Sequence, residues 1–189
     1  MKRWLAAGLS ILMLALFGAG CGGKDTKNPI ATLELKNGKT IKIELFKEAA
    51  PETVANFIEL AECGFYDDLT FHRVVPGFVV QAGDPKGDSS GGPGYTIKGE
   101  FSANGVDNPT EHVRGVVSMA RREDDYDSAG SQFFICLADS PQLNGLYAAF
   151  GRVMDDESMA VVDDMATLTV DANGKPASPP VIKTIKIEK

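Results

Sequence analysis

The sequence predicts a mainly β domain, in which an antiparallel sheet that is closed or nearly closed is capped by two α-helices. Short apolar runs alternate with clusters of Gly, Pro, Asn and Asp, which is the pattern of many short strands. Only two segments have helical periodicity, one early and one late in the chain. The length of 189 residues, with 43% hydrophobic and 24% charged residues, predicts one globular domain.

Residues 1–20 are predicted to be an export signal rather than a part of this domain. Two basic residues precede an apolar stretch over 4–17, and small residues then lead into Cys21. This layout resembles the lipobox of bacterial lipoproteins, although Gly18 stands where that family usually has a branched apolar residue. The resemblance implies an extracytoplasmic protein that is anchored to the cell membrane by lipid at Cys21, with a flexible tether over 21–29. A soluble exported form and an uncleaved anchor are the alternatives.

The domain is predicted to begin at Ile30 with a β-hairpin and a helix. Apolar residues alternate with polar ones over 31–35 and over 41–45, and an Asn-Gly pair between them suits a tight turn. The helix begins at Pro51, whose fixed φ suits the first turn, and ends at Gly64.

The remaining elements are predicted from shorter patterns. A second helix is expected over 157–165, and alternation resumes over 181–187 as a final strand. Five further apolar runs between the two helices are expected to be strands, at 71–75, 78–82, 115–120, 132–137 and 148–153. The chain has no internal repeat and no low-complexity segment.

Composition and missing motifs exclude several classes of function. The net charge of −7, from 19 basic and 26 acidic residues, argues against nucleic acid as a partner. The sequence has no phosphate-binding loop, no nucleophile elbow and no zinc-protease motif, so we expect no cofactor and no metal. The acidic run 123–127 could be a calcium loop, but Ala129 stands where an EF-hand needs a ligand, and a solvated loop is expected.

Cys63 and Cys136 are the cysteines of the predicted domain. They have no Cys-x-x-Cys spacing, and we expect both to be buried structural thiols, because unpaired cysteine behaves as a small hydrophobic residue. A disulfide and a reactive nucleophile are the alternatives.

Polar side chains interrupt two apolar segments. The segment 71–84, FHRVVPGFVVQAGD, holds Arg73 and Gln81 within predicted strands, and a second such region comprises 118–121 and 130–135. Strand interiors seldom hold Arg or Gln unless the side chain faces a ligand or meets a partner. For Arg73 taken alone, a salt bridge to a neighbouring carboxylate is the alternative.

Together these motifs resemble the cyclophilin family of peptidyl-prolyl cis-trans isomerases, particularly its bacterial members. The likeness rests on FHRVxPGFxxQxGD, SMA and GSQFFI, and it covers Pro29 to the C-terminus. It implies an eight-stranded antiparallel closed barrel capped by two α-helices over 30–189, with the catalytic groove on the outside. It also implies a protein without cofactors that binds proline-containing peptides and unfolded exported proteins, which we expect to act as a monomer.

The resemblance also assigns site residues. Arg73 and Gln81 match catalytic positions. The positions that match substrate-binding residues are Phe78, Val79, Ala120, Arg121, Gln132, Phe134, Leu143 and Tyr147. Gln142 occupies a position that is tryptophan in cyclosporin-sensitive members, which predicts weak cyclosporin binding. The loop 121–129 is longer than in familiar members and is expected to border the groove.

These residue types suit rotation about a peptide bond. In the twisted transition state the lone pair of the proline nitrogen is localised, so a fixed donor such as Arg73 stabilises that state more than the planar ground state. We therefore expect an isomerase that assists the folding of exported proteins. A chaperone or assembly module that grips proline segments with little turnover is the alternative, and a lipoprotein that captures a small solute finds little support.

Overall fold

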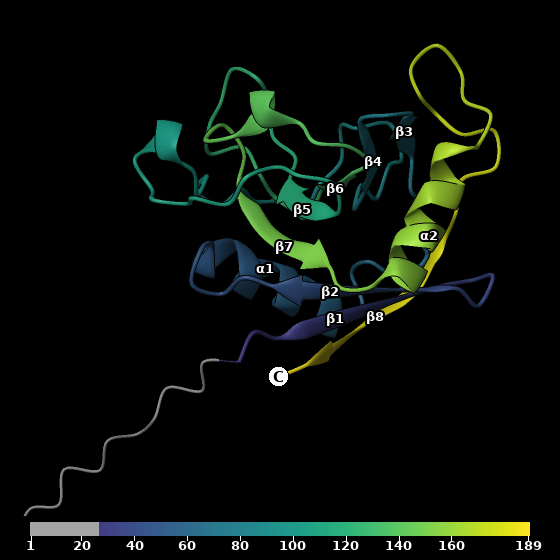
Figure 1. Cartoon of the computed structure of the whole chain (residues 1–189), viewed down its shortest axis with the longest axis horizontal. Coiled ribbons are helices and arrows are strands. Elements are labelled where there is room, and N and C mark those ends of the chain that lie inside the picture. Colours follow the sequence, from purple (N-terminus) through teal and green to yellow (C-terminus); the bar gives the residue numbers. More distant parts are fainter. Residues whose placement is uncertain (1–26) are drawn as a thin grey trace, which may run out of the picture.

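Residues 27–189 are described by the computed structural model, and they fold around one curled antiparallel sheet with two helices (Figure 1). The order across the sheet is β3-β4-β6-β5-β7-β2-β1-β8. The eight strands are β1 (Ile30–Leu35), β2 (Thr40–Leu45), β3 (Arg73–Val75), β4 (Val79–Ala82), β5 (Val116–Met119), β6 (Phe133–Cys136), β7 (Ala149–Val153) and β8 (Ile182–Glu188). The mainly β prediction and the antiparallel pairing are confirmed.

The expectation of a closed barrel is not supported. The edge strands β3 and β8 do not pair with each other; the residues before β3 meet the start of β8 through an isolated bridge between Thr70 and Val181 and through backbone hydrogen bonds of Asp68 and Leu69 with Ile182. Phe71 N–H donates to the carbonyl of Pro180 at 2.9 Å, but Pro180 has no N–H to return. The sheet is therefore a curled half-barrel. Its two edges meet over a short stretch, where Pro180 limits the number of backbone hydrogen bonds.

The predicted export signal over 1–20 and the lipidation site Cys21 lie outside the described residues, as does most of the predicted tether. The described chain begins beside its own end, because Ile30 pairs with Glu188 across β1 and β8. Within 27–189 no helix is long and apolar enough to cross a bilayer.

The first hairpin forms as its alternation predicts. The buried side chains of β1 and β2 alternate with more exposed ones, and the two strands pair from Ile30–Glu44 to Glu34–Thr40. Gly38 has a φ of 83°, which a residue without a side chain adopts at little cost, and its N–H donates to the carbonyl of Leu35.

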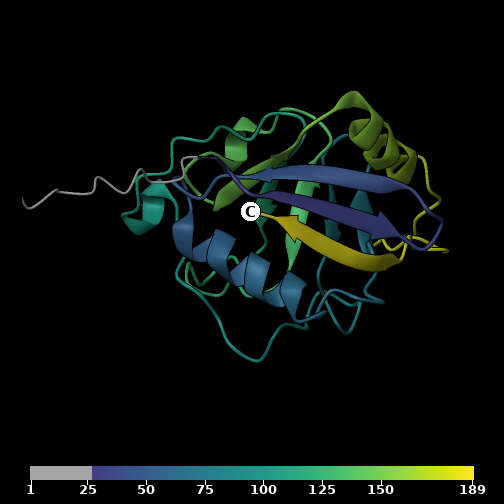
Figure 2. The same ribbon diagram turned by 90° about the horizontal axis from the view of Figure 1, so that it is seen from below.

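The two helices lie beyond opposite edges of the strand group β8-β1-β2, with α1 (Pro51–Glu62) next to β8 and α2 (Asp156–Ala166) next to β2 (Figure 2). Helix α1 ends at Glu62, and Gly64 just beyond it has a φ of 75°, which favours glycine after a helix. The side chain of Asp155 caps α2 by accepting a hydrogen bond from Ser158 N–H at 2.7 Å.

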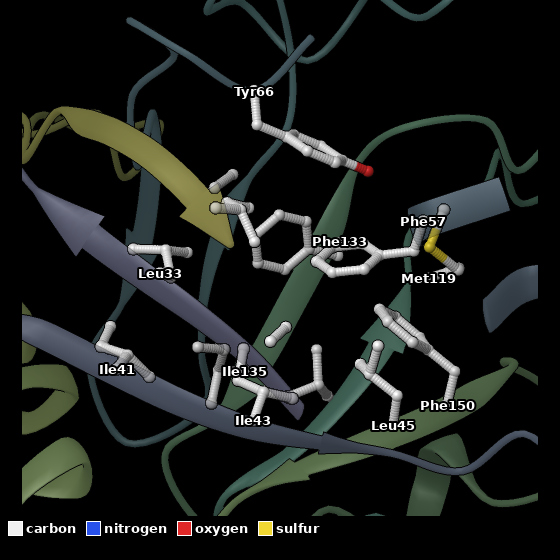
Figure 3. Packing of buried hydrophobic residues seen from close by; sticks show 14 of the residues in the cluster. Leu33, Ile41, Ile43, Leu45, Phe57, Tyr66, Met119, Phe133, Ile135 and Phe150 are labelled. Carbon is white, nitrogen blue, oxygen red and sulfur yellow. The ribbon is translucent and has the colours of Figure 1, made fainter. Parts of the chain in front are cut away.

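The main core fills the inside of the curled sheet and is rich in aromatic rings (Figure 3). The ring of Phe57 on α1 lies 5.1 Å from Tyr66, 5.5 Å from Phe133 and 5.2 Å from Phe150, measured between centroids. These distances are in the range of favourable aromatic pairs, so α1 is held to the sheet through one side chain that contacts several strands or loops.

The cysteine prediction is half right. Both thiols are free, so the disulfide alternative is wrong, and Cys136 is fully buried. Cys63 is exposed because it directly follows the last turn of α1, where the chain leaves the helix before Gly64. Its thiol contacts the carbonyl of Leu60 at 3.3 Å.

Candidate active site

The strands β3, β4 and β6 carry the site on the face that points away from the main core. Val74, Val80 and Ile135 belong to the core inside the sheet. Arg73 pairs with Gln81, which pairs with Phe134 on the next strand. Because directly opposite residues of antiparallel strands lie on the same face, these last three side chains form a row on the outside of the sheet.

A cavity of about 940 Å³ runs along this row. It is lined by all ten side chains that the sequence assigned to the site within the described residues, namely Arg73, Phe78, Val79, Gln81, Ala120, Arg121, Gln132, Phe134, Leu143 and Tyr147. They come from strands, loops and the short 3-10 helix η2 (Pro141–Leu143). The fold therefore brings the predicted set together, and the role of each residue stays a prediction.

One part of the cavity is an apolar pocket built by a second hydrophobic cluster, separate from the core. Val79, Phe134 and Leu143 are buried in it, and Cys136 lies fully buried among them. Tyr147 packs edge-to-face against Phe134, with ring centroids 5.7 Å apart. Burial raises the pKa of the Cys136 thiol to about 12, so this thiol is neutral and is no nucleophile.

A chain of hydrogen bonds forms the polar side of the cavity. Arg73 Nη1 donates to Gln81 Oε1 at 3.4 Å, and Gln81 Nε2 donates to Gln132 Oε1 at 2.8 Å. Gln132 Nε2 then donates to the carbonyl of Gly91 at 2.8 Å. Each amide accepts from one neighbour and donates to the next, so both glutamines are fixed in one orientation.

Arg73 is half-buried and makes no salt bridge within the described residues, so the ion-pair alternative is wrong. Its contact with Gln81 satisfies one of the five N–H donors that a guanidinium presents. The remaining donors are available to a ligand in the cavity.

Comparisons with known proteins show which family this chain is part of. The model of the family described as cyclophilin type peptidyl-prolyl cis-trans isomerase/CLD matches residues 30–187. The chain is 49% identical over 132 residues to a peptidyl-prolyl cis-trans isomerase of Synechococcus elongatus, covering 70% of this chain and 85% of that protein.

The chain belongs to the cyclophilin-type isomerase family.

Two further relatives agree. Peptidyl-prolyl cis-trans isomerase B of Bacillus subtilis is 54% identical over 119 residues, which cover 63% of this cyclophilin and 79% of that protein. A crystal structure of a Cryptosporidium parvum cyclophilin, obtained in the presence of the dipeptide Ala-Pro, superposes with a TM-score of 0.74 at 32% identity. That match covers 85% of this chain and 99% of the other. The protein is therefore a peptidyl-prolyl cis-trans isomerase.

Arg121 holds two walls of the cyclophilin groove together. Its guanidinium carbon lies 4.7 Å from the ring centroid of Tyr147 and 4.8 Å from that of Tyr126. Its Nε donates to the carbonyl of Leu146 at 2.9 Å, and its Nη1 donates to the carbonyl of Arg122 at 2.7 Å. The loop after β5 is thereby tied to the segment that carries Tyr147 through cation–π contacts and hydrogen bonds.

His112 supports the apolar pocket from behind, a role that no motif in the sequence indicates. Its ring stacks on Phe134 at 6.2 Å between centroids. Its Nε2 lies 3.0 Å from Ser118 Oγ, and its Nδ1 lies 3.2 Å from Asn144 Oδ1. Burial lowers the pKa of His112, although the hydrogen bond to Asn144 opposes this shift. The imidazole is therefore neutral, with Nδ1 as donor and Nε2 as acceptor.

Several lining residues were missed as site residues. The loop over 89–96 forms the far wall of the cavity, together with Arg122, Glu123 and Ser128. The sequence GGPG over 91–94 also resembles the cyclophilin family, and it is the signal that could have placed the loop at the site. Gln142 is exposed and does not line the cavity.

Hydrogen bonds and an ion pair within the protein organise the acidic loop 123–127. Asp125 pairs with Arg122, and Asp127 Oδ1 accepts from Gly99 N–H at 2.9 Å and from Asn104 Nδ2 at 2.7 Å. Within residues 27–189 no group of three or more His, Cys, Asp or Glu side chains is placed to hold a metal. The longer loop 121–129 borders the groove, as the sequence predicted, through Arg121, Arg122, Glu123 and Ser128.

Proposed function

We propose that this cyclophilin accelerates rotation of X-Pro bonds in proteins that have left the cytoplasm, and that it acts as a monomer anchored to the cell membrane by lipid at Cys21. The basic, apolar and small residues that precede Cys21 support the anchor. The arrangement of all ten site residues around a cavity within one chain supports the monomer.

The chemistry of the cavity supports a direct role for Arg73. Rotation about a peptide bond has a barrier of about 18 to 20 kcal/mol, because the nitrogen lone pair is delocalised into the carbonyl. In the twisted state that lone pair is localised and accepts a hydrogen bond. The Arg73 guanidinium donates to the nitrogen in this state more strongly than in the planar ground state.

The apolar pocket holds the proline ring in place during the rotation. We assign Phe78, Val79, Phe134 and Leu143 to the proline ring, which contacts them while the preceding residues turn. Ala120, the backbone of Arg121, and Gln132 line the continuation of the cavity, and we assign them to the residues before proline. Tyr147 closes the pocket over Phe134.

The observation that carries this assignment is the row Arg73, Gln81 and Phe134. It places a donor with free N–H groups beside an apolar pocket, on the same face of three neighbouring strands. Gln81 orients the guanidinium, and its own orientation is fixed by Gln132. The presence of the dipeptide Ala-Pro in the crystals of the Cryptosporidium parvum cyclophilin supports a proline-containing ligand for this groove.

Arg73→Ala tests the assignment. We expect kcat/KM for a proline tetrapeptide to fall at least about tenfold, because about 1.4 kcal/mol or more of transition-state stabilisation is lost. Arg152→Ala is the matched control, because Arg152 on β7 is exposed, pairs with Glu44 and does not line the cavity. Unchanged turnover by Arg73→Ala would defeat the assignment.

The same variant separates catalysis from a binding function. A module that only grips proline segments would suppress aggregation of an unfolded client equally well with and without Arg73. We expect suppression to be retained and the acceleration of proline-limited refolding to be lost. A wild-type chain that suppresses aggregation without accelerating proline-limited refolding would favour the chaperone or assembly module.

The anchor is tested separately. Metabolic labelling with a fatty acid is expected to label the wild-type chain, and Cys21→Ser is expected to remain unlabelled and to leave the membrane fraction. Equal labelling of the two would exclude Cys21 as the lipidation site. Sedimentation of the detergent-solubilised chain at the mass of one copy would agree with a monomer.

A further inference from the structure

The outer edge of β3 is covered by a hairpin from the C-terminal part of the chain. On its inner edge β3 pairs with β4, from Arg73–Gln81 to Val75–Val79. On the outer edge the N–H of Val74 donates to the carbonyl of Gly174 at 2.7 Å. Because unpaired strand edges are prone to non-native pairing, such a cover protects the short strand that carries Arg73.

The covering segment, which we call the 170–176 hairpin, is fixed by its own hydrogen bonds. Val170 and Pro176 form an isolated β-bridge that closes it. Asp171 Oδ1 accepts from Asn173 N–H at 2.8 Å and from Lys175 N–H at 2.9 Å, which is an Asx-type turn. The tip is therefore held by a side chain within the hairpin.

Gly174 brings the hairpin backbone close to β3 at Val74, beside Arg73. Its φ is 81°, and a Cβ at this position would lie 2.7 Å from the Val74 carbonyl oxygen and 3.5 Å from Arg73 Cγ. Any side chain would thus have to push the hairpin away from β3. Glycine allows the close approach, and the hairpin is thereby fixed to the backbone of β3 directly after Arg73.

The guanidinium end of Arg73 has little other support. Its one side-chain hydrogen bond, to Gln81, is long at 3.4 Å. A long arginine side chain loses rotamer entropy when it is ordered, so a stem that is restrained before substrate arrives delivers its donors with a smaller entropic loss.

We propose that the 170–176 hairpin is a positioning element for the isomerase reaction, and that Gly174 is the residue through which it restrains Arg73. This inference rests on the proposed role of Arg73. The hairpin is hydrogen-bonded to Val74, which directly follows Arg73, and it does not line the cavity, so it acts on the rate of rotation rather than on binding of the proline ring.

Gly174→Ala in the full-length chain, compared with Gly38→Ala, tests the proposal. Gly38 has nearly the same φ of 83°, but nothing lies within 4 Å of its Cβ position, so both variants carry the same backbone strain and only one displaces a neighbour. We expect kcat of Gly174→Ala to be at least about threefold below that of Gly38→Ala, with similar KM for both. A smaller difference in kcat would overturn the proposal.

Two further measurements decide the case if Gly174→Ala fails to fold or if Arg73 proves dispensable. Asp171→Ala should lower kcat at least about threefold relative to Asp171→Asn, because only the asparagine keeps an oxygen that accepts the two N–H groups. Equal kcat values would overturn the proposal. The Nε–H NMR signal of Arg73 should shift or broaden in Gly174→Ala but not in Gly38→Ala, and this reports on positioning even if Arg73→Ala keeps full activity.

Discussion

Arg121 illustrates how one residue organises part of the groove without a carboxylate partner. Its guanidinium is surrounded by the rings of Phe101, Tyr126 and Tyr147 and donates to backbone carbonyls. A planar cation suits this setting, because it can stack and donate at the same time.

Arg121→Ala is expected to release Tyr147 and the loop after β5, and thereby to raise KM for a proline tetrapeptide about three- to tenfold with little change in kcat. Arg121→Lys should restore only part of the loss, because an ammonium group cannot stack on the rings as a plane does. Steady-state kinetics of the two variants provide the measurement. An unaltered KM in Arg121→Ala would show that the loop keeps its place without this side chain.

Gln142 is a second single residue with a predicted effect, in this case on inhibitor binding. It is exposed on the short helix η2, next to Leu143, which lines the pocket. The amide offers neither the area nor the N–H of an indole, so cyclosporin is expected to bind weakly while peptide turnover remains intact. Gln142→Trp should tighten binding by about tenfold or more in an inhibition titration. Low-nanomolar inhibition of the wild type would contradict this prediction.

At the scale of elements, helix α1 begins without a capping side chain of its own. Its N-cap residue is Ala50, and the orphan N–H groups of Glu52 and Thr53 donate instead to the two carboxylate oxygens of Glu100, at 3.0 and 2.7 Å. A buried carboxylate at a helix N-terminus satisfies these donors and interacts favourably with the helix dipole. The cap therefore comes from 48 and 47 residues further along the chain.

Glu100→Ala is expected to lower the free energy of unfolding by about 2 kcal/mol, because it leaves two helix N–H groups unpaired and removes the charge. Glu111→Ala is the control, since Glu111 is exposed and should change stability by less than about 0.5 kcal/mol. Urea unfolding of the two variants makes the comparison. Equal midpoints would mean that the helix finds another cap.

At the scale of the whole molecule, the two histidines couple stability to pH. Both are buried, and burial lowers the pKa of His72 and of His112 below the ordinary value of 6.5. The unfolded chain therefore takes up protons on these rings at a higher pH than the folded chain. The stability that the neutral rings contribute is present above pH 6.5 and is lost as the pH falls through their folded-state pKa values.

We expect the melting temperature to fall steadily between pH 6.5 and about pH 5, before the aspartates begin to titrate. His112→Gln should melt at a lower temperature at neutral pH. Its melting temperature should depend less steeply on pH, because one of the two buried histidines is removed. Thermal melts across this window make the test. Parallel slopes in the variant and the wild type would assign the pH dependence to other groups.

The local elements were predictable because their causes are local. The alternation of β1 and β2, the proline at the start of α1 and Gly64 at its end act over a few residues, and the structure places these elements within two residues of the prediction. The ordered motifs around Arg73 and Gln81 indicated the cyclophilin family and its isomerase activity. All ten predicted side chains then line one cavity.

Contacts between distant segments could not be read in this way, and only the tertiary structure decided them. The curled sheet stays open between β3 and β8, Cys63 is exposed, and Glu100 caps a helix far from it in sequence. The packing of His112 against the pocket and the hydrogen bond of Gly174 to β3 are also contacts between distant segments. The sequence by itself determined which elements form and which chemistry they carry, because propensity and pattern act locally. Which segments meet depends on the packing of the whole chain.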